Sequence, residues 1–146
     1  MKRRLVLSLA LALSLSAIGA SSALAHAQEG AQKAPLYGPS TIAPCPTGAA
    51  PTPETFGFAV LNSPGDETTV TGEIALKHAS PNTTYNVLLA QDEPGCNTTP
   101  LGELTTNARG NGNLHFSTER IPGTTKFFVG VLSGGELFAN AAVELD

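Results

Sequence analysis

Residues 70–77, Val70-Thr71-Gly72-Glu73-Ile74-Ala75-Leu76-Lys77, decide the fold class of this 146-residue chain. Val70, Ile74 and Leu76 fall on one set of alternate positions, and polar side chains occupy most of the other set. A period of two predicts a β-strand with one face toward a core and the other toward water.

Six further apolar runs of this kind follow one another from residue 55 to the end of the chain. Turn-forming residues divide them, and no stretch of this region has the spacing of an amphipathic helix. Seven short strands in one small domain predict an all-β fold, a single seven-stranded antiparallel immunoglobulin-like β-sandwich over residues 55–146. The six other strands are expected near residues 56–60, 85–89, 101–106, 114–116, 126–132 and 137–145.

One segment supports that fold by resemblance. Residues 80–89, Ser-Pro-Asn-Thr-Thr-Tyr-Asn-Val-Leu-Leu, resemble the Pro-x-Thr-x-Tyr-x-Val segment of fibronectin-type and other immunoglobulin-like sandwiches, including small secreted bacterial proteins of unassigned role. The resemblance implies that Tyr85 anchors a corner at the start of a strand. It implies a fold and carries no activity with it.

The first 27 residues are typical of a secretory signal peptide. Lys2, Arg3 and Arg4 precede the uncharged Leu/Ala/Ser-rich stretch 5–18. Two small-residue motifs, at 23–25 and 25–27, predict cleavage after residue 25 or 27. We therefore expect a secreted protein, extracellular or in the cell envelope, without membrane insertion after cleavage. An uncleaved anchor is the alternative, although the serines and the short apolar run weaken it.

Residues 28–54 differ from the rest of the chain. Six prolines (Pro35, Pro39, Pro44, Pro46, Pro51 and Pro53) recur there among small residues, with little apolar periodicity. This composition predicts an extended linker or stalk. Cys45, within it, and Cys96 are the two cysteines of the chain. In an oxidising compartment they are expected to form a disulfide, with free thiols that bind a metal as the alternative.

Charge excludes two classes of partner. The full chain has a net charge of −4, and loss of residues 1–27 removes three basic residues and no acidic one, which leaves a net charge of −7. An acidic chain without a Lys/Arg cluster is poorly suited to nucleic acid or to an anionic membrane surface. The expected partner is an extracellular protein or a cell-surface ligand.

The residues that could carry metal or hydrolytic chemistry are few. His78 and His115 remain after cleavage, and a metal site needs at least three converging ligands, so neither a metal nor another cofactor is predicted. His115 and Ser117 share one strand face, but strand alternation alone explains that arrangement. Asn107, Asn111 and Asn113 are neutral residues around two glycines, which indicates a turn rather than a calcium site. An enzyme is therefore not expected.

The segment 92–100 is the candidate recognition loop. It is acidic, bounded by prolines and tethered by Cys96, and its candidate contact residues are Asp92, Glu93, Asn97 and Thr98. A rigid tethered loop loses less entropy on binding. The alternative is that Cys96 merely anchors the linker.

The predicted function is a non-catalytic binding or adhesion-type module. A self-assembling extracellular layer protein and a small protease inhibitor that uses the Cys96 loop are the alternatives.

Overall fold

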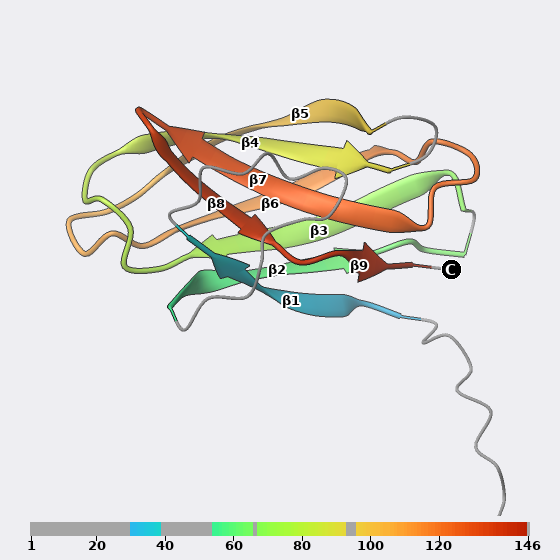
Figure 1. Cartoon of the computed structure of the whole chain (residues 1–146), viewed down its shortest axis with the longest axis horizontal. Coiled ribbons are helices and arrows are strands. Elements are labelled where there is room, and N and C mark those ends of the chain that lie inside the picture. Colours follow the sequence, from blue (N-terminus) through green and yellow to red (C-terminus); the bar gives the residue numbers. More distant parts are fainter. Residues whose placement is uncertain (1–29, 39–53, 66, 93–95, 146) are drawn as a thin grey trace, which may run out of the picture.

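The computed structural model describes residues 30–38, 54–65, 67–92 and 96–145, and these residues form β-strands without a helix (Figure 1). The signal peptide predicted over residues 1–27 lies outside them. The strands, in chain order, are β1 (Gln32–Tyr37), β2 (Thr55–Asn62), β3 (Thr69–Leu76), β4 (Thr84–Gln91), β5 (Asn97–Thr105), β6 (Gly112–Glu119), β7 (Lys126–Ser133), β8 (Glu136–Asn140) and β9 (Val143–Glu144).

The strands form one sheet, and this corrects the predicted two-sheet sandwich. The all-β class is confirmed, but nine strands lie in a single antiparallel sheet of order β5-β4-β7-β8-β1-β2-β3-β6, with β9 paired to β7. The sheet curls into a nearly closed barrel, so that its two terminal strands, β5 and β6, lie next to each other without forming a ladder.

Strand β1 explains why the strands form one sheet and not the two layers of a sandwich. Without it, the remaining strands would fall into two groups, β5-β4-β7-β8 and β2-β3-β6, which are the two layers of a sandwich. β1 pairs with β2 on one side and with β8 on the other, and so joins both groups into one wall. The seven-strand prediction lacked this strand.

β1 lies inside the segment that was expected to be a linker. Ala34 and Leu36 point into the barrel and are buried, whereas Pro35 is exposed between them. Proline has no N–H to donate, and the ladder with β2 shifts register between Pro35 and Tyr37. The folded unit therefore begins before residue 55. Residues 39–53, the remainder of that proline-rich stretch, lie outside the described residues.

Two other strands differ from the prediction. β5 begins at Asn97 rather than at Leu101, because Asn97 to Pro100 pair with the end of β4 and Leu101 occupies an irregular position in that ladder. The predicted seventh strand is divided in two: β8 pairs with the C-terminal half of β7, and β9 pairs with its start. A single straight strand over 137–145 is therefore wrong.

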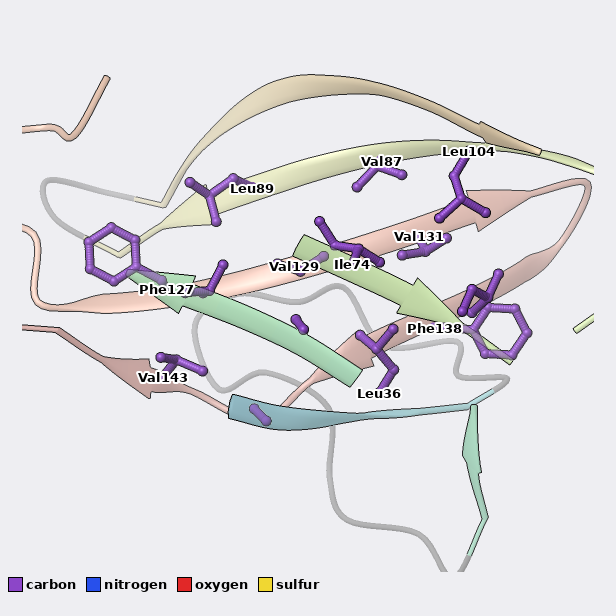
Figure 2. Packing of buried hydrophobic residues seen from close by; sticks show 14 of the residues in the cluster. Leu36, Ile74, Val87, Leu89, Leu104, Phe127, Val129, Val131, Phe138 and Val143 are labelled. Atoms are coloured by element: carbon purple, nitrogen blue, oxygen red, sulfur yellow. The ribbon is translucent and has the colours of Figure 1, made fainter. Parts of the chain in front are cut away.

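The apolar side chains that alternate along the strands meet inside the barrel (Figure 2). Tyr85, Val87 and Leu89 of β4, the strand expected near residues 85–89, are all buried. Phe127, Val129 and Val131 of the neighbouring strand β7 and Phe138 of β8 continue this apolar lining. One core thus holds the whole wall, and the loops at its two ends are positioned by it.

Within the described residues, no helix is long and apolar enough to cross a membrane.

Candidate functional site

Three connections and the C-terminal strand gather at one end of the barrel, on the right in Figure 1, which we name the loop end. The connections are β2–β3 (63–68), β4–β5 (92–96) and β6–β7 (120–125). The predicted recognition residues are at this end. Binding residues commonly lie on loops that a rigid scaffold positions.

The recognition loop is shorter than predicted. Asn97 pairs with Gln91 and Thr98 with Ala90, so these two candidates are exposed residues of β5 rather than loop residues. The connection itself runs from 92 to 96, where the backbone N–H of Cys96 donates to the carbonyl of Asp92 at 3.4 Å. Asp92 N–H in turn donates to the carbonyl of Lys126 at 3.1 Å, which ties this connection to β7. Glu93 lies outside the described residues.

Gln91 joins the β4–β5 connection to the β6–β7 connection. Its side chain is 1% exposed, on the inward phase of β4. Its amide nitrogen donates to the carbonyl of Glu119 at 3.0 Å, and its amide oxygen accepts from Ile121 N–H at 2.8 Å. Gln91 therefore joins β4 to the end of β6, on the side of the barrel where β5 and β6 form no ladder. Sequence reasoning missed this residue, although its inward phase after Leu89 was the available signal.

Arg120 joins the β6–β7 connection to the β2–β3 connection and to the C-terminal end. Its guanidinium donates to Ser63 Oγ (3.0 Å), to the carbonyl of Thr124 (2.7 Å from Nη2) and to the carbonyl of Leu145 (3.2 Å). It also lies 5.5 Å from the centre of the Phe127 ring. Its backbone N–H donates to the carbonyl of Thr68 at 2.8 Å. Sequence reasoning missed Arg120 as well, since no local pattern shows these long-range acceptors.

A hollow of about 340 Å³ lies between the β2–β3 and β6–β7 connections. Glu67 and Thr68 line it from one side and Arg120, Thr124 and Thr125 from the other, together with the turn residues Pro122 and Gly123. Its wall thus offers hydroxyls, a carboxylate and turn backbone. Polar groups of this kind suit a polar ligand or the polar surface of a partner.

A second polar cluster lies at the opposite end of the barrel. The hydroxyl of Tyr85 donates to Glu136 Oε2 at 2.6 Å, and Ser80 Oγ donates to Glu136 Oε1 at 3.0 Å. The backbone N–H of Ser80 donates to the Tyr85 oxygen at 3.2 Å. Burial, followed by the hydrogen bond to Glu136, raises the pKa of Tyr85. This cluster links the β3–β4 connection to the β7–β8 hairpin.

A shallow hollow of about 310 Å³ lies beside that hairpin. Asn86, Leu132 and Leu137 line it, with the turn residues 133–136. Gly134 and Gly135 both have positive φ values, 52° and 105°, as a tight two-residue hairpin turn requires. No charged group other than Glu136 lines this hollow among the described residues, so it offers less for recognition than the loop end.

The two histidines are not brought together. His115 is on the outer face of β6, with its Nε2 3.8 Å from Glu73 Oε1 and its side chain 71% exposed. His78 follows β3 in a left-handed conformation (φ 57°) and is exposed. Leu76 pairs with Gly112, three ladder positions from the Glu73–His115 pair. The described residues contain no group of three or more His, Cys, Asp or Glu that could hold a metal ion.

The asparagine-rich connection between β5 and β6 is a turn, as expected. Asn107 Oδ1 accepts from the backbone N–H of Arg109 at 2.8 Å and from that of Asn111 at 3.1 Å. These bonds occupy the side-chain oxygen locally.

Of the two cysteines in the predicted disulfide, only Cys96 lies within the described residues. Cys96 is at the start of β5 with a φ of 56°, and it is not a free cysteine. Cys45 lies outside the described residues, so the pairing of Cys45 with Cys96 stays a prediction.

Comparisons with known proteins add no relative: no family model, no curated protein and no solved structure matches this chain.

Proposed function

We propose that this chain is an exported, non-catalytic binding module whose recognition surface is the loop end of the barrel. The partner is an extracellular protein or a cell-surface ligand. The surface comprises the described parts of the connections 63–68, 92–96 and 120–125, together with the exposed residues Asn97 and Thr98.

The network of side-chain and backbone bonds between these connections is the observation that carries the proposal. Gln91 joins the β4–β5 connection to the β6–β7 connection. Arg120 joins the β6–β7 connection to the β2–β3 connection and to Leu145. Asp92 is hydrogen-bonded to Lys126. Each bond limits how far one connection moves relative to another. A surface that is ordered before binding loses less conformational entropy when a partner docks.

The charge of this surface indicates the chemistry of the partner. Glu67, Glu119 and Glu144 are exposed around the loop end, whereas Lys126 is the exposed cation there among the described residues. Lys126 is also the ladder partner of Glu144. A partner with cationic or neutral polar groups at the contact fits this distribution better than an anionic one.

Binding of the mature chain to intact producing cells and to proteins concentrated from their medium tests the proposal. We compare the native chain with a loop-end variant, Glu67→Lys combined with Thr125→Lys, by biolayer interferometry. Both side chains are exposed and line the hollow, so the fold is retained. We expect the loop-end variant to lose binding through slower association and faster dissociation.

A matched control changes the charge equally at the opposite end, by Glu103→Lys combined with Ala108→Lys, again at exposed positions. The control is expected to bind like the native chain. Equal loss of binding by both variants, or native binding by the loop-end variant, contradicts the proposed surface.

Two observations bear on the alternative functions. Free strand edges favour self-assembly, but β5 and β6, the terminal strands of the described sheet, adjoin each other, and Pro100 and the irregularity at Leu101 interrupt β5. A five-residue connection closed by the Cys96–Asp92 bond keeps protease inhibition as a second candidate. Slowed hydrolysis by an extracellular protease, lost on Asp92→Lys, would favour it over the binding module.

A further inference from the structure

Strand β6 ends the described sheet and has one edge without a ladder. It pairs with β3 on one side, and no described strand pairs with it on the other. Arg120 N–H donates to the carbonyl of Thr68 at 2.8 Å, in the register of the β3–β6 ladder. Because antiparallel neighbours are hydrogen-bonded at every second residue, this bond identifies the residues of β6 whose backbone groups point away from β3. These residues are Asn113, His115, Ser117 and Glu119.

The contact between Glu119 and Gln91 agrees with this assignment. The carbonyl of Glu119 accepts from the side chain of Gln91 on β4, so it points away from β3. The N–H and carbonyl groups of His115 and Ser117 lie along the same edge as that carbonyl. A row of backbone donors and acceptors at a sheet edge is a template for pairing with another strand.

Strand β5 lies beside β6 but does not occupy this edge. The two strands touch through side chains: the Leu104 side chain packs against Gly112, and the methyl groups of Leu114 lie close to Gly102. Leu114, which points into the barrel, is only half-buried, whereas its ladder partner Ile74 on β3 is 0% exposed. The barrel wall is therefore open on the side of β6 that faces away from β3.

We propose that β6 pairs antiparallel with β6 of a second copy of this chain, about a two-fold axis at Phe116. The proposal does not depend on the proposed function. Two observations carry it: the self-complementary order of the side chains along β6, and the interrupted edge of β5, the other terminal strand.

The register centred on Phe116 uses the edge from Asn113 to Glu119. His115 lies opposite Ser117 of the second copy, and each such pair exchanges two backbone hydrogen bonds. Asn113 lies opposite Glu119 of the second copy in the same way. The half-buried Phe116 side chains of the two copies become direct neighbours, and aromatic cross-strand pairs stabilise a sheet.

The charges on the outer face of β6 suit this register. Glu119 of the second copy is a diagonal neighbour of His115, about 7–8 Å away and within reach of a long side chain. Two other symmetric registers preserve the alternation of the backbone bonds. Centring on His115 sets this residue opposite itself, which opposes like charges when the rings are protonated. Centring on Ser117 sets Asn113 opposite Ile121, beyond the end of β6, and shortens the pairing.

Pairing through β6 stops at two copies. The other terminal strand, β5, contains Pro100, which has no N–H to donate, and its ladder with β4 is irregular near Leu101. A two-fold contact uses the same patch on both copies, so no second β6 edge remains after pairing. The expected product is a closed dimer and not an extended layer.

Sedimentation equilibrium and amide hydrogen exchange on the mature chain test the pairing together. We expect the average mass to rise with concentration from that of a monomer toward that of a dimer, without larger species. Over the same range, exchange of the His115 and Ser117 amides should slow, whereas the Phe116 amide, which is bonded to β3, should be protected throughout. A strict monomer, or a dimer in which the His115 and Ser117 amides exchange as in the monomer, would overturn the proposal.

Variants of the β6 edge separate pairing from folding. Ser117→Pro removes an N–H that points away from β3, so the β3–β6 ladder is retained while the dimer should be lost. His115→Lys combined with Ser117→Lys sets lysines opposite each other across the axis and should also give a monomer. Protection of the Phe116 amide reports that each variant is folded.

The matched control, Thr98→Lys combined with Thr105→Lys, adds the same charge at exposed positions of β5. It is expected to dimerise like the native chain. Dimers formed by both β6 variants, or equal loss of the dimer in the β5 control, would contradict pairing through β6.

Discussion

The phenolic oxygen of Tyr85 lies 2.6 Å from Glu136 Oε2, although 51 residues separate the two in the chain. The same oxygen accepts from the backbone N–H of Ser80, and Ser80 Oγ donates to the other oxygen of Glu136. Tyr85 is buried and packs edge-on against Phe138, with ring centres 5.9 Å apart. One hydroxyl thus connects the start of β4, the β3–β4 connection and the β7–β8 hairpin.

Tyr85→Phe should destabilise the barrel. The substitution keeps the ring and removes the hydroxyl, so Glu136 Oε2 loses a donor and Ser80 N–H loses an acceptor. The free energy of unfolding should fall by about 1–3 kcal/mol, the usual effect of leaving such groups without a partner. Urea unfolding followed by circular dichroism measures it. Tyr37→Phe, at a half-buried position, is the control and should change stability less.

Stability should also depend on the ionisation of Tyr85. Burial first, and the bond to Glu136 second, raise the pKa of Tyr85 above its ordinary value of 10.0. Above pH 10 the folded state therefore keeps a proton that the unfolded chain releases. The contribution of Tyr85 is fully present below pH 10 and is lost as the pH rises through the folded pKa. The ultraviolet absorbance of tyrosinate follows this titration. Tyr85→Phe should remove the step that occurs at the highest pH.

Gln91→Ala should loosen the loop end more than the rest of the barrel. The side chain is buried, and its loss leaves the carbonyl of Glu119 and the N–H of Ile121 without these partners. We expect a loss of about 1–3 kcal/mol, given about 0.5–1.5 kcal/mol for each of the two hydrogen bonds. Hydrogen exchange of the Ile121 amide should accelerate beyond that of Val131. Thr98→Ala, at an exposed position of β5, is the control, and equal acceleration at both amides would contradict the local role of Gln91.

Asn140→Asp should make stability strongly dependent on pH. Asn140 is 0% exposed; its Oδ1 accepts from Val129 N–H at 2.5 Å, and its Nδ2 has no hydrogen-bond partner among the described residues. Loss of Nδ2 therefore removes no bond, but ionisation would place an unpaired charge inside the barrel. Burial raises the pKa of the new carboxyl above the value of about 3.9 in the unfolded chain.

The variant should accordingly match the native chain below about pH 4 and lose about 3–5 kcal/mol by neutral pH, as an uncompensated buried charge does. Urea unfolding at several pH values checks this prediction. Asn113→Asp, at an exposed position of β6, should show no comparable slope.

The predicted bridge between Cys45 and Cys96 should stabilise the chain. Closing a loop of about 50 residues lowers the entropy of the unfolded chain by an amount equivalent to about 4 kcal/mol. Cys45→Ser combined with Cys96→Ser should lower the unfolding midpoint accordingly. Intact-mass measurement of the exported protein should show a mass about 2 Da below that of the reduced mature chain, since two thiol hydrogens are lost. A measured mass equal to that of the reduced mature chain would contradict the predicted bridge.

Much of the strand content could be predicted because it depends on local alternation. The period of two in residues 70–76, and in Tyr85, Val87 and Leu89, places these side chains on the inner face whatever the arrangement of the strands. The Asn107 turn was predictable for the same reason, since its side chain bonds to backbone groups two and four residues on.

The candidate site was only partly predictable. The acidic connection near Asp92 was visible in the sequence, but the length of β5 depends on the ladder between β4 and β5, which places Asn97 and Thr98 on a strand. Gln91 and Arg120 act on residues 28 and 57 positions away in the chain, at Glu119 and Ser63. No local pattern reports such contacts.

By itself, the sequence determined that this chain is all-β, where most of its strands lie, and that residues 28–146 carry a net negative charge, because alternation and charge are local properties. The tertiary structure decided that the strands close into one barrel rather than two layers. Residues 32–37 look like part of a proline-rich linker, yet Ala34 and Leu36 become buried once β2 and β8 provide ladder edges on both sides. Whether a weakly apolar segment becomes a strand depends on those distant edges, and they exist only in the folded chain.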